Sequence, residues 1–367
     1  MLKKSEPRTE YPPTVFAPRG PVSEQLLVVL QLPATAAAPK MEGFAAQVSA
    51  AVDQSPDIVR DDDLQLSLLI LQGLHYGGLI ETDDNWEWNP TLIAARIAIE
   101  REFERVLRRD VPVPELPDPD PEAVAAALFE LTKPSPGPSV PRFIAKHATK
   151  EQAREYVILR SVYTLKEADP QTWAIPRLTG RPKAALVEIQ FDEYGGGRPA
   201  RIHSEIFARM MRRLDLDDSY GAYLDQVPSL TIASFTMMGM FGMNRAMRGA
   251  MAGHYAAYEM TSSIPNRFLG DGFRRLGYGP DVTDYFDEHV EADAVHEQIA
   301  GRDLAGGLAQ QEPQLLSDIM FGANTSLIVD GWDATETLEA WKAGRSALRD
   351  PAANFSAATE PVMAGDQ

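Results

Sequence analysis

One predicted helix carries two histidines and an aspartate at a spacing that suits a metal site. In the segment 284–297, His289, Asp293 and His296 are separated by four and then three residues. At about 100° per residue of an α-helix, these three side chains lie along one stripe. Imidazole and carboxylate groups are metal ligands, so such a stripe can hold a metal ion. A solvated helix rich in histidine and acids has the same composition and is the alternative interpretation.

A two-metal site in a helical bundle needs further ligands from facing helices. Glu259 is a candidate because apolar residues lie one turn before it, and Glu167 ends a predicted helix with an apolar face. Glu193 and His203 flank the glycine-rich break 194–199, which would let two consecutive helices face one centre. For Glu167 an ordinary helix end is the alternative.

The composition limits which chemistry and which partners are possible. The chain has 367 residues, 35 Lys and Arg against 53 Asp and Glu, a net charge of −18, six histidines and no cysteine. The acidic balance argues against nucleic acid and anionic membranes as partners, because phosphate recognition needs basic surface. The absence of cysteine excludes disulfides, iron–sulfur clusters and thiolate-bound haem. Any metal would therefore use histidines and carboxylates.

The elements that would position these residues are predicted to be helical throughout. Helical periodicity or composition appears over 41–52, 61–75, 91–109, 121–131, 151–166, 182–194, 201–214, 227–263, 282–300 and 313–332, whereas 24–32 is helical or strand-like. The most apolar stretch, 227–243, contains serines and threonines and is interpreted as a core helix, not a membrane span. The start of the chain lacks the apolar run of a secretory signal, so we expect a cytoplasmic protein.

Prolines suggest how the chain is divided, because nine of the 28 fall between residues 112 and 141. We expect a flexible N-terminus over 1–20, a helical N-terminal region over 21–110, a proline-rich linker with one helix over 111–145, the main helical domain over 146–345 and a disordered tail over 346–367. The fold class is therefore all-α, a helical bundle preceded by a smaller helical region.

The same residues carry a resemblance to a known family. The steps from Glu167 to Glu193, His203, Glu259, His289, Asp293 and His296 are 26, 10, 56, 30, 4 and 3 residues. This pattern, over roughly 152–332, resembles the haem-oxygenase-like di-iron oxidases and oxygenases, a group of iron-containing redox enzymes. The resemblance implies a haem-oxygenase-like bundle with two Fe²⁺ ions and no haem, and a dimer-forming role for the N-terminal helices.

The resemblance also implies which residues hold the metal. Six would be shared ligands, namely Glu167, His203, Glu259, His289, Asp293 and His296. Glu193 would be the additional carboxylate of N-oxygenating members, although Glu188 is a competing candidate. The four carboxylates would bring −4 against the +4 of two ferrous ions, so the assembled centre would be neutral.

The expected activity is that of a non-haem di-iron oxygenase with O₂ as co-substrate. It would N-oxygenate an amine or guanidine nitrogen of an amino-acid-like small molecule, with an external electron donor, in a homodimer. Desaturation or oxidative C–C cleavage of an amino or fatty acid is one alternative, and a catalytically silent binding or scaffold protein is another. Candidate anchors for a substrate carboxylate are Arg245, Arg248 and Arg267, with surface ion pairs as the alternative. Tyr255 and Tyr258 could shape the pocket or serve only in packing.

Overall fold

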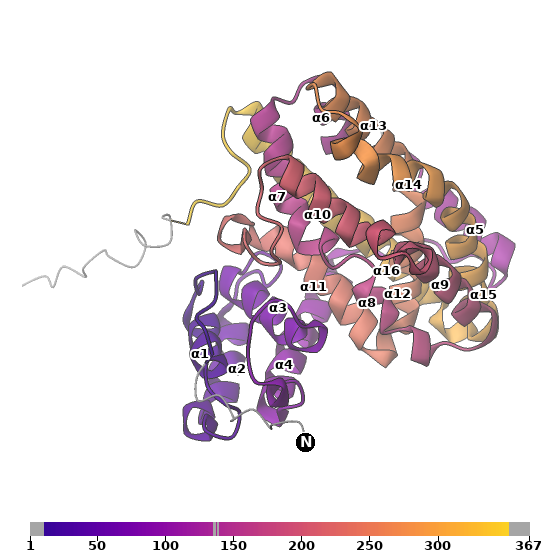
Figure 1. The fold of residues 1–367 in the computed structure, drawn as a ribbon. Coiled ribbons are helices and arrows are strands. Elements are labelled where there is room, and N and C mark those ends of the chain that lie inside the picture. Colours follow the sequence, from indigo (N-terminus) through magenta and orange to yellow (C-terminus); the bar gives the residue numbers. More distant parts are fainter. Residues whose placement is uncertain (1–10, 135–136, 138, 352–367) are drawn as a thin grey trace, which may run out of the picture.

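The computed structural model describes residues 11–134, 137 and 139–351, apart from the side chains of 38, 39 and 292–294. Within these residues the chain forms helices and no strand, which confirms the all-α prediction (Figure 1). The α-helices are α1 (Pro21–Leu30), α2 (Phe44–Gln54), α3 (Asp62–Tyr76), α4 (Pro90–Asp110), α5 (Pro121–Leu131), α6 (Val140–Lys146), α7 (Lys150–Thr164), α8 (Asp169–Thr172), α9 (Gly180–Glu193), α10 (His203–Arg213), α11 (Ser229–Met243), α12 (Arg248–Met260), α13 (Ser263–Arg275), α14 (Pro280–Gln298), α15 (Gly307–Gln311) and α16 (Leu316–Lys342). A π-helix over Ile299–Gly306 joins α14 to α15.

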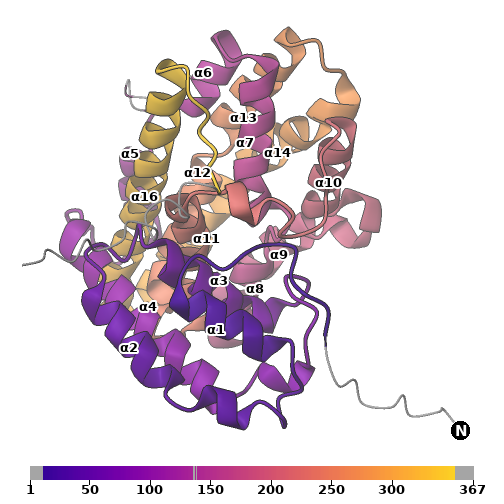
Figure 2. The ribbon, with the colours of Figure 1, turned by 90° about the vertical axis from the view of Figure 1, so that its left-hand side faces the viewer.

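Helices α1 to α4 form a group beside the larger bundle, and α11 lies between the two (Figures 1 and 2). One continuous hydrophobic core contains residues of α1 to α4 together with residues of α11, α12 and α16. Buried polar contacts also join α3 to α11, because Thr236 donates to Gln65 Oε1 at 2.7 Å and Gln72 Nε2 donates to the Thr236 carbonyl at 3.0 Å. The N-terminal helices thus support α11 from the side opposite the bundle.

The single helix predicted over 227–263 is wrong, because two helices occupy this segment. Helix α11 ends at Met243, and the backbone of Asn244 is extended. The side-chain Nδ2 of Asn244 donates to the Met240 carbonyl at 2.8 Å and to Glu100 Oε2 at 3.0 Å. The Arg177 guanidinium donates to the carbonyls of Gly242 and Met243, which have no partner inside the helix. A cation at a helix C-terminus satisfies these carbonyls and the helix dipole, so the break is stabilised by residues distant in sequence.

The proline-rich segment 111–145 contains two helices, α5 and α6, where one was expected. Val124 and Leu128 of α5 are buried in the main core, and Ile144 of α6 is buried in a second cluster with α7, α10, α13 and α14. Proline at the first or second position starts each helix, where its missing N–H costs nothing. Helix α13 was not predicted, and α16 runs ten residues beyond the expected end at 332.

The chain ends are partly fixed on the bundle where the structure describes them. Phe16 is buried, and Arg19, within the expected flexible N-terminus, pairs with Asp62 at 2.9 Å. Residues 346–350, expected in the disordered tail, also make contacts, since the Ala347 N–H donates to Glu155 Oε2 at 2.9 Å and the Arg349 N–H to the Gln226 carbonyl at 2.7 Å. The expectations for 1–10 and 352–367 lie outside the described residues.

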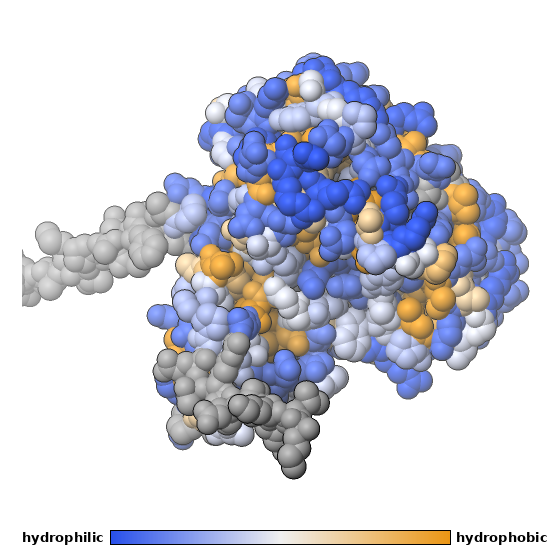
Figure 3. Space-filling model, in the orientation of Figure 1, coloured by the Kyte–Doolittle hydropathy of each residue, from blue (hydrophilic) through white to orange (hydrophobic). Residues whose placement is uncertain are grey.

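The face shown in Figure 3 is largely hydrophilic, with hydrophobic residues in separate small groups. Among the described residues, no helix combines the length and apolar character that crossing a bilayer requires. Helices α12 and α16 pack so closely that a Cβ at Gly253 would overlap the carbonyl oxygen of Ile319, and one at Gly322 would overlap that of Ala250. This close approach fixes α12, which ends beside Glu259, against the longest helix of the bundle.

Candidate metal centre

A glycine turn brings the end of α9 against the start of α10. Gly195, Gly196 and Gly197 all have positive φ angles, between 59° and 76°, which residues with a side chain rarely adopt. A Cβ at Gly195 would also lie only 2.6 Å from the backbone nitrogen of Ile202. The chain reverses tightly here, and Glu193 Oε2 lies 2.9 Å from His203 Nδ1. The predicted meeting of two consecutive helices at one centre is therefore present in the fold.

Glu167 faces α14 from the turn that follows α7. Both of its carboxylate oxygens accept from the Tyr285 hydroxyl at 2.9 Å, and Oε1 lies 3.5 Å from His289 Nε2. The Nδ1 of His289 lies 2.7 Å from the Tyr285 carbonyl, which can only accept, so Nδ1 carries the proton. This hydrogen bond leaves Nε2 as the ring nitrogen that can bind a metal.

His296, two turns further along α14, lies between two carboxylates. Its Nδ1 is 3.4 Å from Glu259 Oε2, and its Nε2 is 3.1 Å from Asp192 Oδ2. Asp192 therefore holds the outer nitrogen of the ring and directs Nδ1 towards Glu259, as carboxylate–histidine pairs do in metal sites. Asp192 was not predicted as a site residue, although its position next to Glu193 is a sequence signal that could have identified it.

The ligand atoms form two groups that share one residue. Within each group, the donor atoms all lie within 4.8 Å of one another. The first group is Glu167, Glu193, His203 and His289, and the second is Glu193, Glu259 and His296. All six residues are buried, and the most exposed of them, Glu167, has 8 % of its surface accessible. The arrangement is compatible with a di-iron site in which Glu193 is available to both metals.

The electrostatics of the first group fit a bound cation. Burial is the largest single influence on Glu167 and would raise its pKa, but the charges of His289 and His203 and the hydrogen bonds of His289 and Tyr285 together lower the pKa below its usual value. Burial is the largest single influence on His203 and would lower its pKa, but the charge and hydrogen bond of Glu193, with the charge of Glu167, together raise the pKa above its usual value. The buried carboxylates thus stabilise positive charge beside them, and a donor set of nitrogen and oxygen without sulfur suits iron or manganese.

Two remaining ligand expectations have different outcomes. The side chain of Asp293 lies outside the described residues, so its place relative to the two groups stays a prediction. Glu188 is exposed on α9, whereas Glu193 is buried at the end of that helix. Of these two competing carboxylates, the fold brings Glu193 to the cluster.

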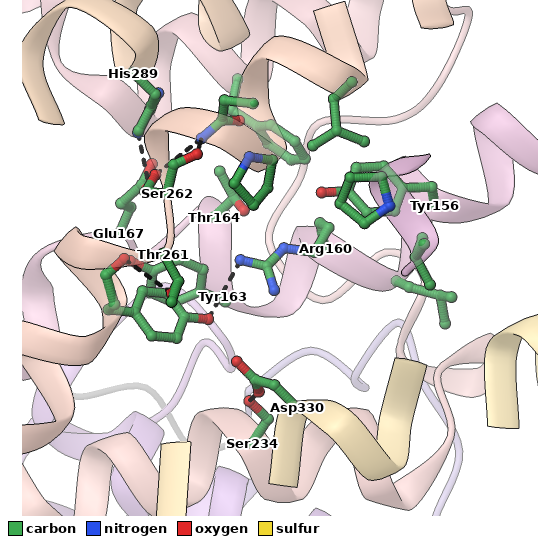
Figure 4. Close-up of a pocket in the computed structure, with 18 of the residues that line it drawn as sticks. Tyr156, Arg160, Tyr163, Thr164, Glu167, Ser234, Thr261, Ser262, His289 and Asp330 are labelled. Atoms are coloured by element: carbon green, nitrogen blue, oxygen red, sulfur yellow. Dashed lines mark hydrogen bonds and ion pairs between the residues drawn. The ribbon is translucent and has the colours of Figure 1, made fainter. Parts of the chain in front are cut away.

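A cavity of about 300 Å³ opens beside the ligands. At one end it is lined by Glu167, Glu193, Glu259 and His289, and its walls include Phe207, Phe286 and Leu269. Figure 4 shows Arg160 near the middle of this pocket, with the Glu167–His289 pair on one side and Asp330 on another. Arg160 was missed from the sequence, although it lies seven residues, or two helical turns, before Glu167.

The candidate substrate residues fall in different places. Tyr258 lines the cavity, but Arg245, Arg248 and Tyr255 are not among the described residues that do so. Arg248, at the start of α12, pairs with Glu312, and Arg245 is exposed. Tyr255 is buried. Arg267 is exposed on α13. The cationic group in the cavity is instead that of Arg160.

Residues 154–331, just under half of the chain, match the model of a family described as iron-containing redox enzyme. No curated protein matches the chain. The matched segment contains all six of the clustered ligand residues. The part of the chain that carries the site is therefore similar to the iron-containing redox enzymes. This similarity supports membership of the haem-oxygenase-like superfamily and indicates an oxidoreductase.

Proposed function

We propose that this protein is a non-haem di-iron oxygenase that uses O₂ to N-oxygenate an amine or guanidine nitrogen of an amino-acid-like metabolite. The observation that carries the proposal is the position of Glu193, which belongs to both groups of ligand atoms. The ligand spacing supports N-oxygenation, because it resembles that of the N-oxygenase domain of the streptozotocin nitrosourea-forming enzyme, including the additional carboxylate at Glu193.

The overall reaction requires two electrons from outside the substrate. Two ferrous ions bound at this cluster would supply the redox chemistry that reduces O₂. One oxygen atom enters an N–H bond to give N–OH, and the other leaves as water. Each turnover therefore consumes two protons and two electrons, and an external electron donor must provide the electrons.

The protein's own residues orient the ligands and keep water away from the reacting nitrogen. The Tyr285 hydroxyl holds both oxygens of Glu167, and burial raises the pKa of Tyr285, so this hydroxyl remains a donor. Asp192 and the Tyr285 carbonyl fix the ring orientations of His296 and His289. Phe207 and Phe286 give the cavity an apolar wall next to these ligands, which limits the space available to water.

The proposal is tested by metal content together with the fate of O₂. The full chain is loaded with Fe²⁺ without oxygen, its iron is counted, and amines, guanidines and basic amino acids are then turned over with ¹⁸O₂. We expect two iron ions per chain and one ¹⁸O atom bound to nitrogen in the product. Unsaturated or chain-shortened products without an N–¹⁸O bond would favour desaturation or C–C cleavage, and no iron binding would favour a binding or scaffold protein.

A pair of variants on α9 separates the role of Glu193 from general effects on the helix. Glu193→Ala removes the carboxylate shared by both groups, whereas Glu188→Ala removes an exposed carboxylate five residues earlier. We expect Glu193→Ala to lose N-oxygenation, by about a hundredfold or more, and Glu188→Ala to behave as the wild type. Unchanged iron content and turnover in Glu193→Ala would show that the shared-ligand proposal is wrong.

A further inference from the structure

The part of the cavity away from the metal ligands contains charged residues for which the proposed oxidation has no use. Arg160 of α7 and Asp330 and Asp333 of α16 all line it. In Figure 4 the Arg160 guanidinium extends into the pocket from one wall, and Asp330 faces it from another. All three side chains are half-buried, and a charge that is partly withdrawn from water is costly unless it is paired, so this set can gain from a ligand of complementary charge.

Arg160 contacts a hydroxyl and an aromatic ring among the residues that the structure describes. Its Nη2 donates to the Tyr258 hydroxyl at 3.4 Å, and its Cζ lies 5.1 Å from the centre of the Tyr163 ring. Within the described residues, no carboxylate lies in ion-pair distance of this guanidinium. Because arginine has five N–H donors in a planar fork, several remain available to a carboxylate that enters the cavity.

Asp330 and Asp333 are held in place by hydroxyls instead of cations. Ser234 Oγ donates to Asp330 Oδ1 at 2.6 Å, and Thr231 Oγ1 donates to Asp333 Oδ1 at 2.6 Å. The two pairs run in opposite order along α11 and α16, so the helices are antiparallel. Each hydroxyl holds one carboxylate by one of its two oxygens. The second oxygen of each aspartate can still accept from a cationic ligand.

The balance of charge at this end favours a ligand that carries both signs. With both aspartates ionised, one positive and two negative groups surround the space. Burial raises the pKa of Asp333 to about 6 and also raises the pKa of Asp330, while Arg160 and the hydroxyl donors partly offset the burial. A positive group placed between the two carboxylates would relieve this cost.

We propose that Arg160, Asp330 and Asp333 form a head-group subsite for a free α-amino acid, in which Arg160 binds the α-carboxylate and the two aspartates bind the α-ammonium. The inference rests on the proposed function, because the amino acid's side chain would then extend towards Glu167 and His289. A cavity of about 300 Å³ is at the small end of ligand pockets, which fits a single metabolite. We call these three residues the head-group subsite.

The first test removes one charge at a time from the ligand and leaves the protein unchanged. Isothermal titration calorimetry without O₂, on the full chain with and without Fe²⁺, compares L-lysine with 6-aminohexanoate, which lacks the α-amino group, and with cadaverine, which lacks the α-carboxylate. L-Arginine and agmatine form a second such pair. We expect each truncated ligand to bind about tenfold to a hundredfold more weakly than its parent. Because the head-group subsite contains no metal ligand, these ratios should not depend on iron.

Variants then assign each charge to its partner. Arg160→Gln should abolish the preference for L-lysine over cadaverine and keep the preference over 6-aminohexanoate. Asp330→Asn should keep the preference over cadaverine and reduce the preference over 6-aminohexanoate, because Asp333 alone then binds the ammonium. Glu339→Gln, at an exposed position of α16, is the matched control and should change neither ratio. Thermal unfolding checks that each variant folds, and the truncated ligands remain decisive on the wild type if one does not.

Two outcomes would overturn the inference, namely equal affinity for L-lysine and both truncated ligands, or no binding of either amino acid at millimolar concentration. Failure here is distinguishable from failure of the proposed function. If two iron ions bind and ¹⁸O enters a nitrogen of a simple amine, the oxygenase stands without the head-group subsite. If the amino acids bind as expected but no iron is retained, the head-group subsite stands without the oxygenase.

Discussion

The two ends of the cavity are both polar, but they satisfy their charges differently, and the residues of the first end are buried whereas those of the head-group subsite are half-buried. The first end, which we call the metal-ligand end, is the one formed by the two groups of ligand atoms. There, carboxylate oxygens lie 2.9–3.5 Å from histidine ring nitrogens, and within each group all ligand atoms lie within 4.8 Å of one another. At the head-group subsite, opposite charges are kept apart, and hydroxyls of α11 and Tyr258 satisfy them individually. The comparison suggests that the first end is shaped to concentrate ligands on cations, and the second to accept a molecule between separated charges.

The largest effect that we expect comes from a substitution at Gly195, in the turn that brings Glu193 against His203. In Gly195→Ala the new Cβ would meet the Ile202 backbone at 2.6 Å in a backbone region that alanine avoids, so Glu193 and His203 should separate. Iron affinity should fall by about a hundredfold or more. Gly277→Ala is the control, because Gly277 also has a positive φ but its Cβ would meet nothing within 4 Å. Equal iron affinity in the two variants would contradict this role of the turn.

The outer ring nitrogen of His296 provides the next test of the metal-ligand end. The carboxylate of Asp192 orients this ring, and Asp192→Asn replaces that carboxylate with an amide. Loss of such a partner typically costs tenfold to a hundredfold in metal affinity. We expect Fe²⁺ to dissociate faster by about tenfold, measured by chelator competition without O₂. Glu188→Gln, on the same helix, should leave the rate unchanged.

Removing the charge of Asp333 from the head-group subsite should raise the free energy of unfolding. The pKa of Asp333 is raised to about 6 from an ordinary 3.8, so the ionised carboxylate destabilises the fold, and this cost appears as pH rises through about 4 to 6. Asp330, Arg160 and Glu336 are the charged groups that face it. Asp333→Asn should therefore raise the free energy of unfolding at pH 8 by about 2 kcal/mol, and by much less at pH 4.5.

Denaturant titration at the two pH values measures this difference, and calorimetry with L-lysine measures the cost in binding. A purely structural aspartate would give a variant that is less stable at both pH values and binds the ligand as the wild type does. Increased stability together with weaker binding of L-lysine is the result expected if Asp333 serves a ligand and not the fold.

The smallest effect is expected at Arg248, outside both ends of the cavity. Its guanidinium is paired with Glu312 near the surface, and exposed ion pairs contribute about 0–1 kcal/mol. Arg248→Gln should change KM by less than about twofold, whereas Arg160→Gln should raise KM strongly. A large rise of KM in Arg248→Gln would restore Arg248 as the substrate anchor that its sequence position first suggested.

The all-α fold and most helices could be predicted because local periodicity, capping residues and proline act within a few residues of sequence. Asp61, for example, accepts from the Leu64 N–H at the start of α3 at 2.9 Å, a pattern visible in the sequence. The break at Asn244 could not be predicted. It depends on Arg177 and Glu100, which lie 65 or more residues away along the chain.

The sequence alone nominated the residues of the metal-ligand end. Few donor types exist in a chain with six histidines and no cysteine, and helical spacing places His289 and His296 on one face. The full ligand set came from the resemblance of the spacing to the haem-oxygenase-like di-iron family. The tertiary structure alone decided the head-group subsite. Arginine and aspartate are common on any helix, and only the packing of α7, α11 and α16 around one cavity sets these three apart from surface charges. The same packing excludes Arg245 and Arg248 from the cavity lining, since the direction of a side chain depends on how each helix is rotated against its neighbours.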